Sequence, residues 1–121
     1  MLTVDAHCDT ALSVYKGRED DGDLYENRYH LDIKRLVSTG PRVQFFAAFA
    51  NPQKYRNDTL SRVLSILDVV YEAQEKYPDK ISVCKSADDI DMAVSCGKTA
   101  AVLSVEGGEC LNGELSVLRQ L

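Results

Sequence analysis

Short apolar runs that alternate with helical patterns constrain the fold of this chain more than any other feature. The apolar runs occupy residues 2–7, 42–50, 81–86 and 99–106. The helical patterns occupy residues 31–40, 58–77, 86–97 and 113–121. Strands that alternate with helices favour a parallel sheet with helices packed outside it. The predicted fold class is therefore α/β, and in such sheets chemical groups gather at the carboxyl ends of the strands.

Helix signals are clearest at three places. Apolar side chains within residues 58–77 recur at the spacing of one helix face, at Leu60, Val63, Leu64, Leu67, Val70 and Tyr71. Asp32 is placed to cap a short helix that Gly40 ends. Ser86 and Asp89 have the spacing of an N-terminal capping pair. These signals predict helices after the second, first and third apolar runs, respectively.

Residues 16–30 have no periodicity and many charges, so we expect a long solvated loop there. The acidic part of this loop, residues 18–26, lacks the ordered ligands of a calcium-binding EF-hand. The expected order is thus strand, loop, helix, and then three further strands that each precede a helix.

Size and charge narrow the class of protein. With 121 residues and 45% apolar residues, the chain is expected to form one domain over residues 1–121. A net charge of −5 argues against binding to nucleic acid or to an anionic membrane. No apolar run is long enough to span a bilayer, and the four cysteines form no C-x-x-C pair. We therefore expect reduced thiols and a cytoplasmic protein without a membrane partner.

A histidine and an aspartate follow the first apolar run in the sequence VDAHCDT. Strand side chains alternate, so His7 and Asp9 are expected to share one face while Cys8 points to the other. An imidazole and a carboxylate on one face suit a transition metal such as zinc. The spacing alone also fits a loop cap and an ordinary polar pair, and that alternative stays open.

Glu106 ends the apolar run AAVLSVE and precedes Gly107 and Gly108. If the strands are parallel, Glu106 lies at the same rim as His7 and Asp9, where its two oxygens are able to bridge two metal ions. The alternatives are that Glu106 caps the following helix, that it is simply solvated, or that the glycines form a phosphate-binding nest.

Three segments together resemble the amino-terminal part of the membrane dipeptidase family, the M19 metallopeptidases of the amidohydrolase-like group. VDAHCDT resembles the first-strand H-x-D motif of the family, and LDIKRLVSTGPRVQFFAAF resembles the helix and second strand that follow. SADDIDMAVSCGKTAAVLSVEGGECL resembles the helix and strand that lead to the E-G-G motif. The resemblance runs over nearly the whole chain in the same order.

The resemblance implies a (β/α)8 TIM-type barrel and a binuclear zinc enzyme. Its substrates would be dipeptides, including those with a carboxyl-terminal D-residue, cleaved by a metal-bound hydroxide. By carry-over, His7 and Asp9 would hold the first zinc, and Glu106 would bridge both zinc ions and so be the catalytic residue in this chain. The other histidine, His30, precedes a helix and is expected to be a loop residue.

The length departs from this picture, because a complete barrel needs about 250 residues and the chain has 121. We therefore expect a partial barrel, a fragment that is inactive alone and that forms a homo-oligomer to cover its open edge. Two rival functions remain. One is another metal-dependent hydrolase of the amidohydrolase group, and the other is a non-catalytic α/β module that binds a small anion near Gly107 and Gly108.

Overall fold

A four-stranded parallel sheet forms the centre of the computed structural model, which describes residues 1–17 and 20–121. The strands are β1 (Thr3–Asp5), β2 (Arg42–Ala48), β3 (Ile81–Val83) and β4 (Thr99–Val105). Their order in the sheet is β1-β2-β4-β3, so that β4 lies between β2 and β3. The predicted α/β class is confirmed, and the parallel strands with intervening helices are consistent with a partial (β/α)8 TIM-type barrel.

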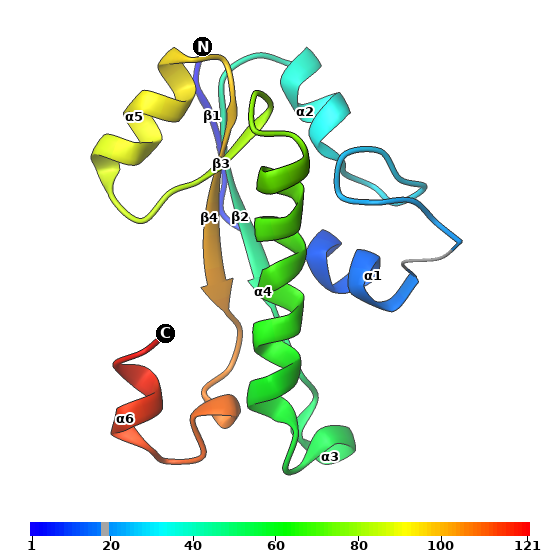
Figure 1. Cartoon of the computed structure of the whole chain (residues 1–121), viewed down its shortest axis with the longest axis vertical. Coiled ribbons are helices and arrows are strands. Elements are labelled where there is room, and N and C mark those ends of the chain that lie inside the picture. The colour runs from blue at the N-terminus through cyan, green and yellow to red at the C-terminus, as the bar shows by residue number, and fades with distance from the viewer. Residues whose placement is uncertain (18–19) are drawn as a thin grey trace.

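Helices lie on both faces of this sheet (Figure 1). They are α1 (Thr10–Gly17), α2 (Ile33–Ser38), α3 (Pro52–Tyr55), α4 (Thr59–Lys76), α5 (Ala87–Ser95), the 3-10 turn η1 (Glu109–Leu111) and α6 (Leu115–Leu118). Figure 1 shows α4 running along the sheet, with α5 near the amino ends of the strands and α6 beyond the carboxyl end of β4. No helix in the described part of the chain is both long and apolar enough to cross a membrane.

Each face of the sheet carries its own apolar cluster. On one face, α1 and α4 pack over Phe46, Ala48 and Ala101, and all three side chains are buried. We call this side the α4 face. On the other face, Ala93 of α5 packs with Val43 and Ala100. We call that side the α5 face, and the alternation of strand side chains assigns every other residue of each strand to it.

The capping residues act as the sequence predicts. The Asp32 carboxylate accepts a hydrogen bond from the Arg35 backbone N–H at 2.8 Å and so begins α2. Ser86 and Asp89 form a reciprocal capping box at the start of α5. Because these side chains satisfy backbone groups that a helix end leaves unpaired, they fix both helix starts. The helix predicted over residues 58–77 is confirmed as α4.

The expectation of a solvated loop over residues 16–30 is wrong in two respects. First, α1 extends to Gly17, and its Val14 is buried in the core. Second, Leu24 in the middle of the predicted loop is only 1% exposed. An apolar side chain in the loop therefore joins the core beside α4, which the lack of periodicity does not reveal. Arg18 and Glu19, which also belong to the predicted loop, lie outside the described residues.

A polar contact fastens the same loop to the end of α4. The Asp23 carboxylate contacts Lys76 Nζ at 2.6 Å and accepts a hydrogen bond from the Tyr77 hydroxyl at 2.9 Å. The rings of Tyr25 and Tyr77 stack with centroids 4.2 Å apart. Partial burial acts to raise the pKa of Asp23, but the hydrogen bonds from Lys76, the loop backbone and Tyr77 outweigh it and lower that pKa below its usual range.

The ends of the chain also differ from expectation. The apolar run over residues 2–7 is typical of a buried strand, yet β1 is at the edge of the sheet and Val4 is 60% exposed. The helical pattern over residues 113–121 forms only the four-residue α6. Both segments have few neighbours to pack against, so periodicity and apolar content alone overstate their burial and their length.

Candidate metal centre

A shift in the register between β1 and β2 decides which face of the sheet the His7 and Asp9 side chains occupy. Within β1, Asp5 lies opposite Gln44 of β2, and the same register would place His7 opposite Phe46. Instead, Cys8 takes the position opposite Phe46. Its N–H donates to the Phe45 carbonyl and its carbonyl accepts from the Ala47 N–H, both at 3.0 Å. One extra residue is thus accommodated between Asp5 and Cys8, in the manner of a β-bulge.

The extra residue decides which face the site residues occupy. Phe46 belongs to the cluster on the α4 face, and Cys8 opposite it packs against that same cluster. Its neighbours His7 and Asp9 therefore turn toward the α5 face, because side chains alternate along an extended chain. Without the extra residue, His7 would point into the apolar core under α4.

Glu106 reaches the same place from β4. Ala100 belongs to the α5 face and Ala101 to the α4 face, so alternation puts Glu106 on the α5 face. Its backbone N–H donates to the Ala48 carbonyl at 3.0 Å, which holds the residue against β2. Parallel strands bring their carboxyl ends to one rim of the sheet, so Glu106 and the residues after β1 meet there.

The turn after Glu106 requires glycine at one position. Gly107 has a φ of 80°, a conformation that side-chain-bearing residues rarely adopt. A Cβ atom there would also collide with the carboxylate of Glu109. Gly107 therefore allows the chain to leave β4 sharply, while Glu106 keeps its place at the rim.

The three side chains converge. His7 Nε2 lies 3.5 Å from Asp9 Oδ2 and 3.8 Å from Glu106 Oε2. One ligand atom from each residue falls within 4.8 Å of the others. The side chains are 54%, 58% and 50% exposed, respectively, so solvent and a substrate have access to them. The structure thus brings together all three residues that the sequence proposed as ligands.

This donor set fits a divalent metal ion. Bonds of about 2.0–2.2 Å from nitrogen and oxygen to a tetrahedral zinc place neighbouring ligand atoms about 3.4 Å apart. The two distances from His7 Nε2 are close to that separation, so only small side-chain movements are needed. Three protein ligands also leave a coordination position open, which is the arrangement of catalytic zinc sites.

Two further groups support the donor set. The His7 backbone N–H, which the register shift removes from the sheet, donates to Asp5 Oδ1 at 3.2 Å. Asp5 therefore fixes the backbone that carries the imidazole. Cys8 is excluded as a ligand on two grounds, because it packs on the opposite face and burial raises the pKa of its thiol.

An ion pair without metal is the simpler alternative for the same geometry. A protonated His7 would be attracted to both carboxylates at the observed distances. The two alternatives differ in their response to an added metal ion and in the effect of replacing the histidine. His30 is exposed and takes no part in the cluster, as the sequence predicts.

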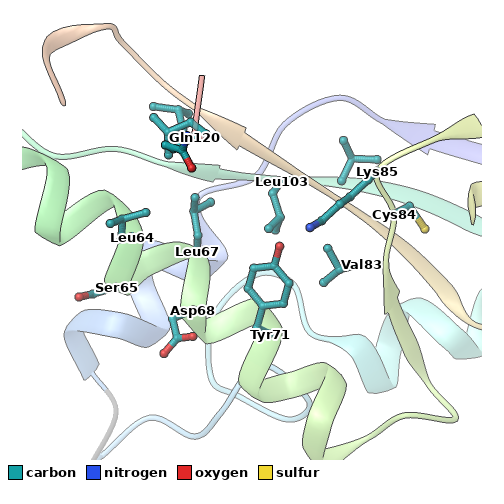
Figure 2. Close-up of a pocket in the computed structure, with 13 residues that line it drawn as sticks. Leu64, Ser65, Leu67, Asp68, Tyr71, Val83, Cys84, Lys85, Leu103 and Gln120 are labelled. Atoms are coloured by element: carbon teal, nitrogen blue, oxygen red, sulfur yellow. The ribbon is translucent and has the colours of Figure 1, made fainter. Parts of the chain in front are cut away.

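A cavity of ≈780 Å³ between α4, β3 and β4 is separate from this cluster. Figure 2 shows Leu67 and Tyr71 of α4 facing Leu103 of β4 across it. Leu103 lies on the α4 face, opposite to the face that carries the candidate ligands His7, Asp9 and Glu106. None of His7, Asp9 and Glu106 lines the cavity, and its lining mixes apolar and polar side chains. It is therefore not part of the candidate metal centre.

Sequence reasoning missed two contributors to the site. The first is Asp5, whose only signal is a carboxylate two residues before the histidine. The second is α1, which begins directly after Asp9 and whose buried residues Ala11 and Val14 have helical spacing. Reading TALSVYKG as an amphipathic segment ended by Gly17 would have found this helix.

The chain is similar to known dipeptidases. The family described as membrane dipeptidase (peptidase family M19) matches residues 1–121. A curated relative, "Dipeptidase tcpJ" from Claviceps purpurea (strain 20.1), is 28% identical over 98 residues. The alignment covers 74% of this chain and 23% of the relative, so the chain spans well under half of the length of the protein that it matches.

Proposed function

Because the chain belongs to the membrane dipeptidase family, peptidase family M19, we propose that His7, Asp9 and Glu106 form its part of a dipeptidase metal centre. The observation that carries this proposal is the convergence of one imidazole and two carboxylates at the carboxyl ends of two parallel strands. The proposed metal is zinc, which accepts nitrogen and carboxylate oxygen ligands. The proposed substrates are dipeptides, including those that end in a D-residue.

Each residue has a separate task in this proposal. His7 would bind the metal through Nε2, the atom that lies nearest to both carboxylates. Asp9 would supply one oxygen, and Glu106 has a second oxygen with which to bridge to a neighbouring ion. When bound, zinc supplies Lewis-acid polarisation of the scissile carbonyl and a water of lowered pKa. Asp5 and the turn at Gly107 keep the ligands in place before the metal arrives.

The arrangement of these residues also bears on the two rival functions, another amidohydrolase-type enzyme and an anion-binding module. An amidohydrolase-type enzyme with another amide or lactone substrate would use the same ligands, so only a substrate panel separates it from a dipeptidase. Anion binding at Gly107 and Gly108 is disfavoured, because the Glu109 carboxylate lies against Gly107 and Glu106 precedes it. Two negative charges at the turn would repel an anion there.

Zinc binding tests the proposed site directly. We expect isothermal titration calorimetry to show zinc uptake by the wild-type protein and a loss of uptake in His7→Ala. His30→Ala is the matched control, because His30 is exposed and outside the cluster. Undiminished uptake in His7→Ala would show that the cluster is a set of ion pairs and would overturn the proposal.

Hydrolysis tests the proposed substrate class. L,L- and L,D-dipeptides would be offered to this chain and to any longer product of the same gene, with added zinc and with a chelator. Zinc-dependent turnover supports the dipeptidase. Zinc binding without turnover of any dipeptide, combined with hydrolysis of another amide, would assign the site to the rival hydrolase class.

A further inference from the structure

A second, smaller cavity combines an apolar floor with positive charge. It has a volume of ≈230 Å³ and lies between α1, α4 and the segment after β2. Its floor includes Leu12, Phe49 and Ile66, and its rim carries Lys16, Lys54 and Arg62. The chain as a whole has a net charge of −5, so a cavity with three cations stands apart from the rest of the molecule.

The cations gather around one phenol ring, that of Tyr55, which also lines the cavity. The Arg62 guanidinium carbon lies 3.6 Å from the ring centroid, and Lys54 Nζ lies 5.1 Å from it. A hydrogen bond from Lys54, with the nearby charges of Arg62, Lys54 and Lys16, lowers the pKa of Tyr55. All three cations are thus close enough to act on one group.

Most of this positive charge has no carboxylate partner among the described residues. Within the described chain, Lys16 and Lys54 form no ion pair with a carboxylate, whereas Arg62 Nε lies 3.4 Å from Asp58 Oδ2. That contact lacks hydrogen-bond geometry, and Arg62 Nε is buried without an acceptor among the described residues. Convergent like charges repel one another and a buried donor without an acceptor is costly, so an anion would relieve both.

The cavity is distinct from the metal centre. None of the three metal ligands lines it. Ile66 and Leu12 belong to or pack against the cluster on the α4 face, whereas His7, Asp9 and Glu106 lie on the α5 face. Ligand binding in the cavity therefore needs no metal ion and does not depend on the proposed dipeptidase function.

We propose that this cavity binds a small organic carboxylate, with its anionic group held by Lys16, Lys54 and Arg62 and its apolar part against Leu12, Phe49 and Ile66. The cations are the donors that bind a carboxylate with charge-assisted hydrogen bonds. The apolar floor gains from burying hydrocarbon, which a simple inorganic anion does not offer. The chemistry of the cavity therefore selects a carboxylate on an apolar body.

A titration with defined probes tests the proposal. Two-dimensional NMR spectra of metal-free, ¹⁵N-labelled protein would be followed as 3-phenylpropionate is added. We expect saturable shifts at the amides of Asn51, Lys54 and Tyr55, which lie in or beside the cavity. The neutral isostere 3-phenylpropionamide should bind more weakly. Rising salt concentration should weaken the binding of the carboxylate but not that of the amide. Equal binding of the acid and the amide would overturn the role of the cations.

Inorganic phosphate is the second arm of the titration. If the apolar floor contributes, phosphate should bind more weakly than 3-phenylpropionate. Phosphate binding of equal or greater strength would show a site that responds to charge alone, and it would overturn the assignment to an organic carboxylate. Absence of saturable shifts with every probe would overturn the site itself.

Matched variants locate the binding. Lys54→Gln removes an exposed cation at the rim, and we expect it to weaken 3-phenylpropionate about threefold to fivefold. Lys85→Gln removes one exposed cation that lines the other, larger cavity, so it should leave the affinity unchanged. Equal weakening by the two variants would show that only the net charge matters and would contradict a built site.

Discussion

The two halves of β4 differ in surroundings although they belong to one strand. In the amino-terminal half, Ala100 and Ala101 are completely buried between β2 and β3. In the carboxyl-terminal half, β3 has ended, the residues from Val102 to Val105 are only partly buried, and the strand leads to the exposed Glu106. The first half thus holds the sheet together, and the second half presents a functional group. Mutations in the two halves should consequently have different consequences.

The largest expected effect lies beside the amino-terminal half, where β3 pairs with β4. Ile81 of β3 pairs with Thr99 of β4 and is completely buried. Ile81→Ala leaves a cavity in the core, and we expect a loss of about 2–5 kcal/mol in the free energy of unfolding. Urea denaturation measures this loss. Val4→Ala is the control, because Val4 is 60% exposed and should change stability by less than about 0.5 kcal/mol.

The carboxyl-terminal half should show the reverse behaviour. Glu106→Gln keeps the shape of the side chain but removes its charge, so we expect zinc affinity to fall by about 100-fold or more, equivalent to about 2.7 kcal/mol. Stability should change little, because Glu106 is exposed. Calorimetric zinc titration and urea denaturation of the same sample separate the two quantities.

Glu109→Gln provides the charge-matched control for this variant. Glu109 is exposed, belongs to η1 and is outside the ligand cluster. Its replacement should leave zinc affinity within a few-fold of wild type. If Glu109→Gln lowered affinity as much as Glu106→Gln, general negative charge rather than direct ligation would explain zinc uptake, and the contrast between the halves of β4 would lose its basis.

A smaller effect is expected at Asp5, whose carboxylate holds the backbone of the candidate ligand His7. Asp5→Ala removes the acceptor for the His7 backbone N–H. Groups that orient a metal ligand typically contribute about 10–100-fold in affinity. Since this contact is made to the backbone, we expect about tenfold weaker zinc binding. Asp5→Asn keeps an acceptor oxygen and should restore most of the affinity, whereas equal losses in both variants would point to the charge of Asp5 instead.

Local interactions explain which parts of the fold the sequence predicts. The periodicity of α4 and the caps at Asp32 and Ser86 involve residues a few positions apart, so each signal is complete within its own segment. By contrast, α1 is short, and its buried Ala11 and Val14 are stabilised by contact with distant parts of the chain. Such tertiary stabilisation leaves only a weak pattern in the sequence.

The residues of the candidate metal site can be picked out from the sequence, but the way in which the fold places them cannot. Polar residues at the carboxyl ends of apolar runs identify His7, Asp9 and Glu106. Simple alternation continued from β1 would have placed His7 on the α4 face, and only pairing with β2 reveals the extra residue that corrects this. Register depends on a partner strand, so it is absent from the local sequence. The cations around Tyr55 likewise come from separate elements without a motif.

The smallest expected effect lies outside β4, at Asp23. Its pKa is lowered in the folded protein, chiefly by Lys76 among the stabilising contacts, so the unfolded chain binds a proton more readily. The contact therefore stabilises the fold at pH values above the unfolded pKa, near 3.8, and this contribution is lost as the pH falls from there through the lower pKa of the folded state. Because the Asp23 side chain is 39% exposed, solvent limits the contribution to less than about 1 kcal/mol.

Asp23→Asn tests the direction of this pH dependence, because the substitution removes the charge and keeps nearly the same side-chain shape. The variant should be less stable than wild type at pH 7, and the difference should shrink toward pH 3, as measured by urea denaturation. Asp91→Asn, at an exposed position of α5, should show no such convergence. A difference that persists unchanged at low pH would mean that Asp23 acts through its loop hydrogen bonds alone. The contact between the loop and α4 would then depend on hydrogen bonding and not on charge.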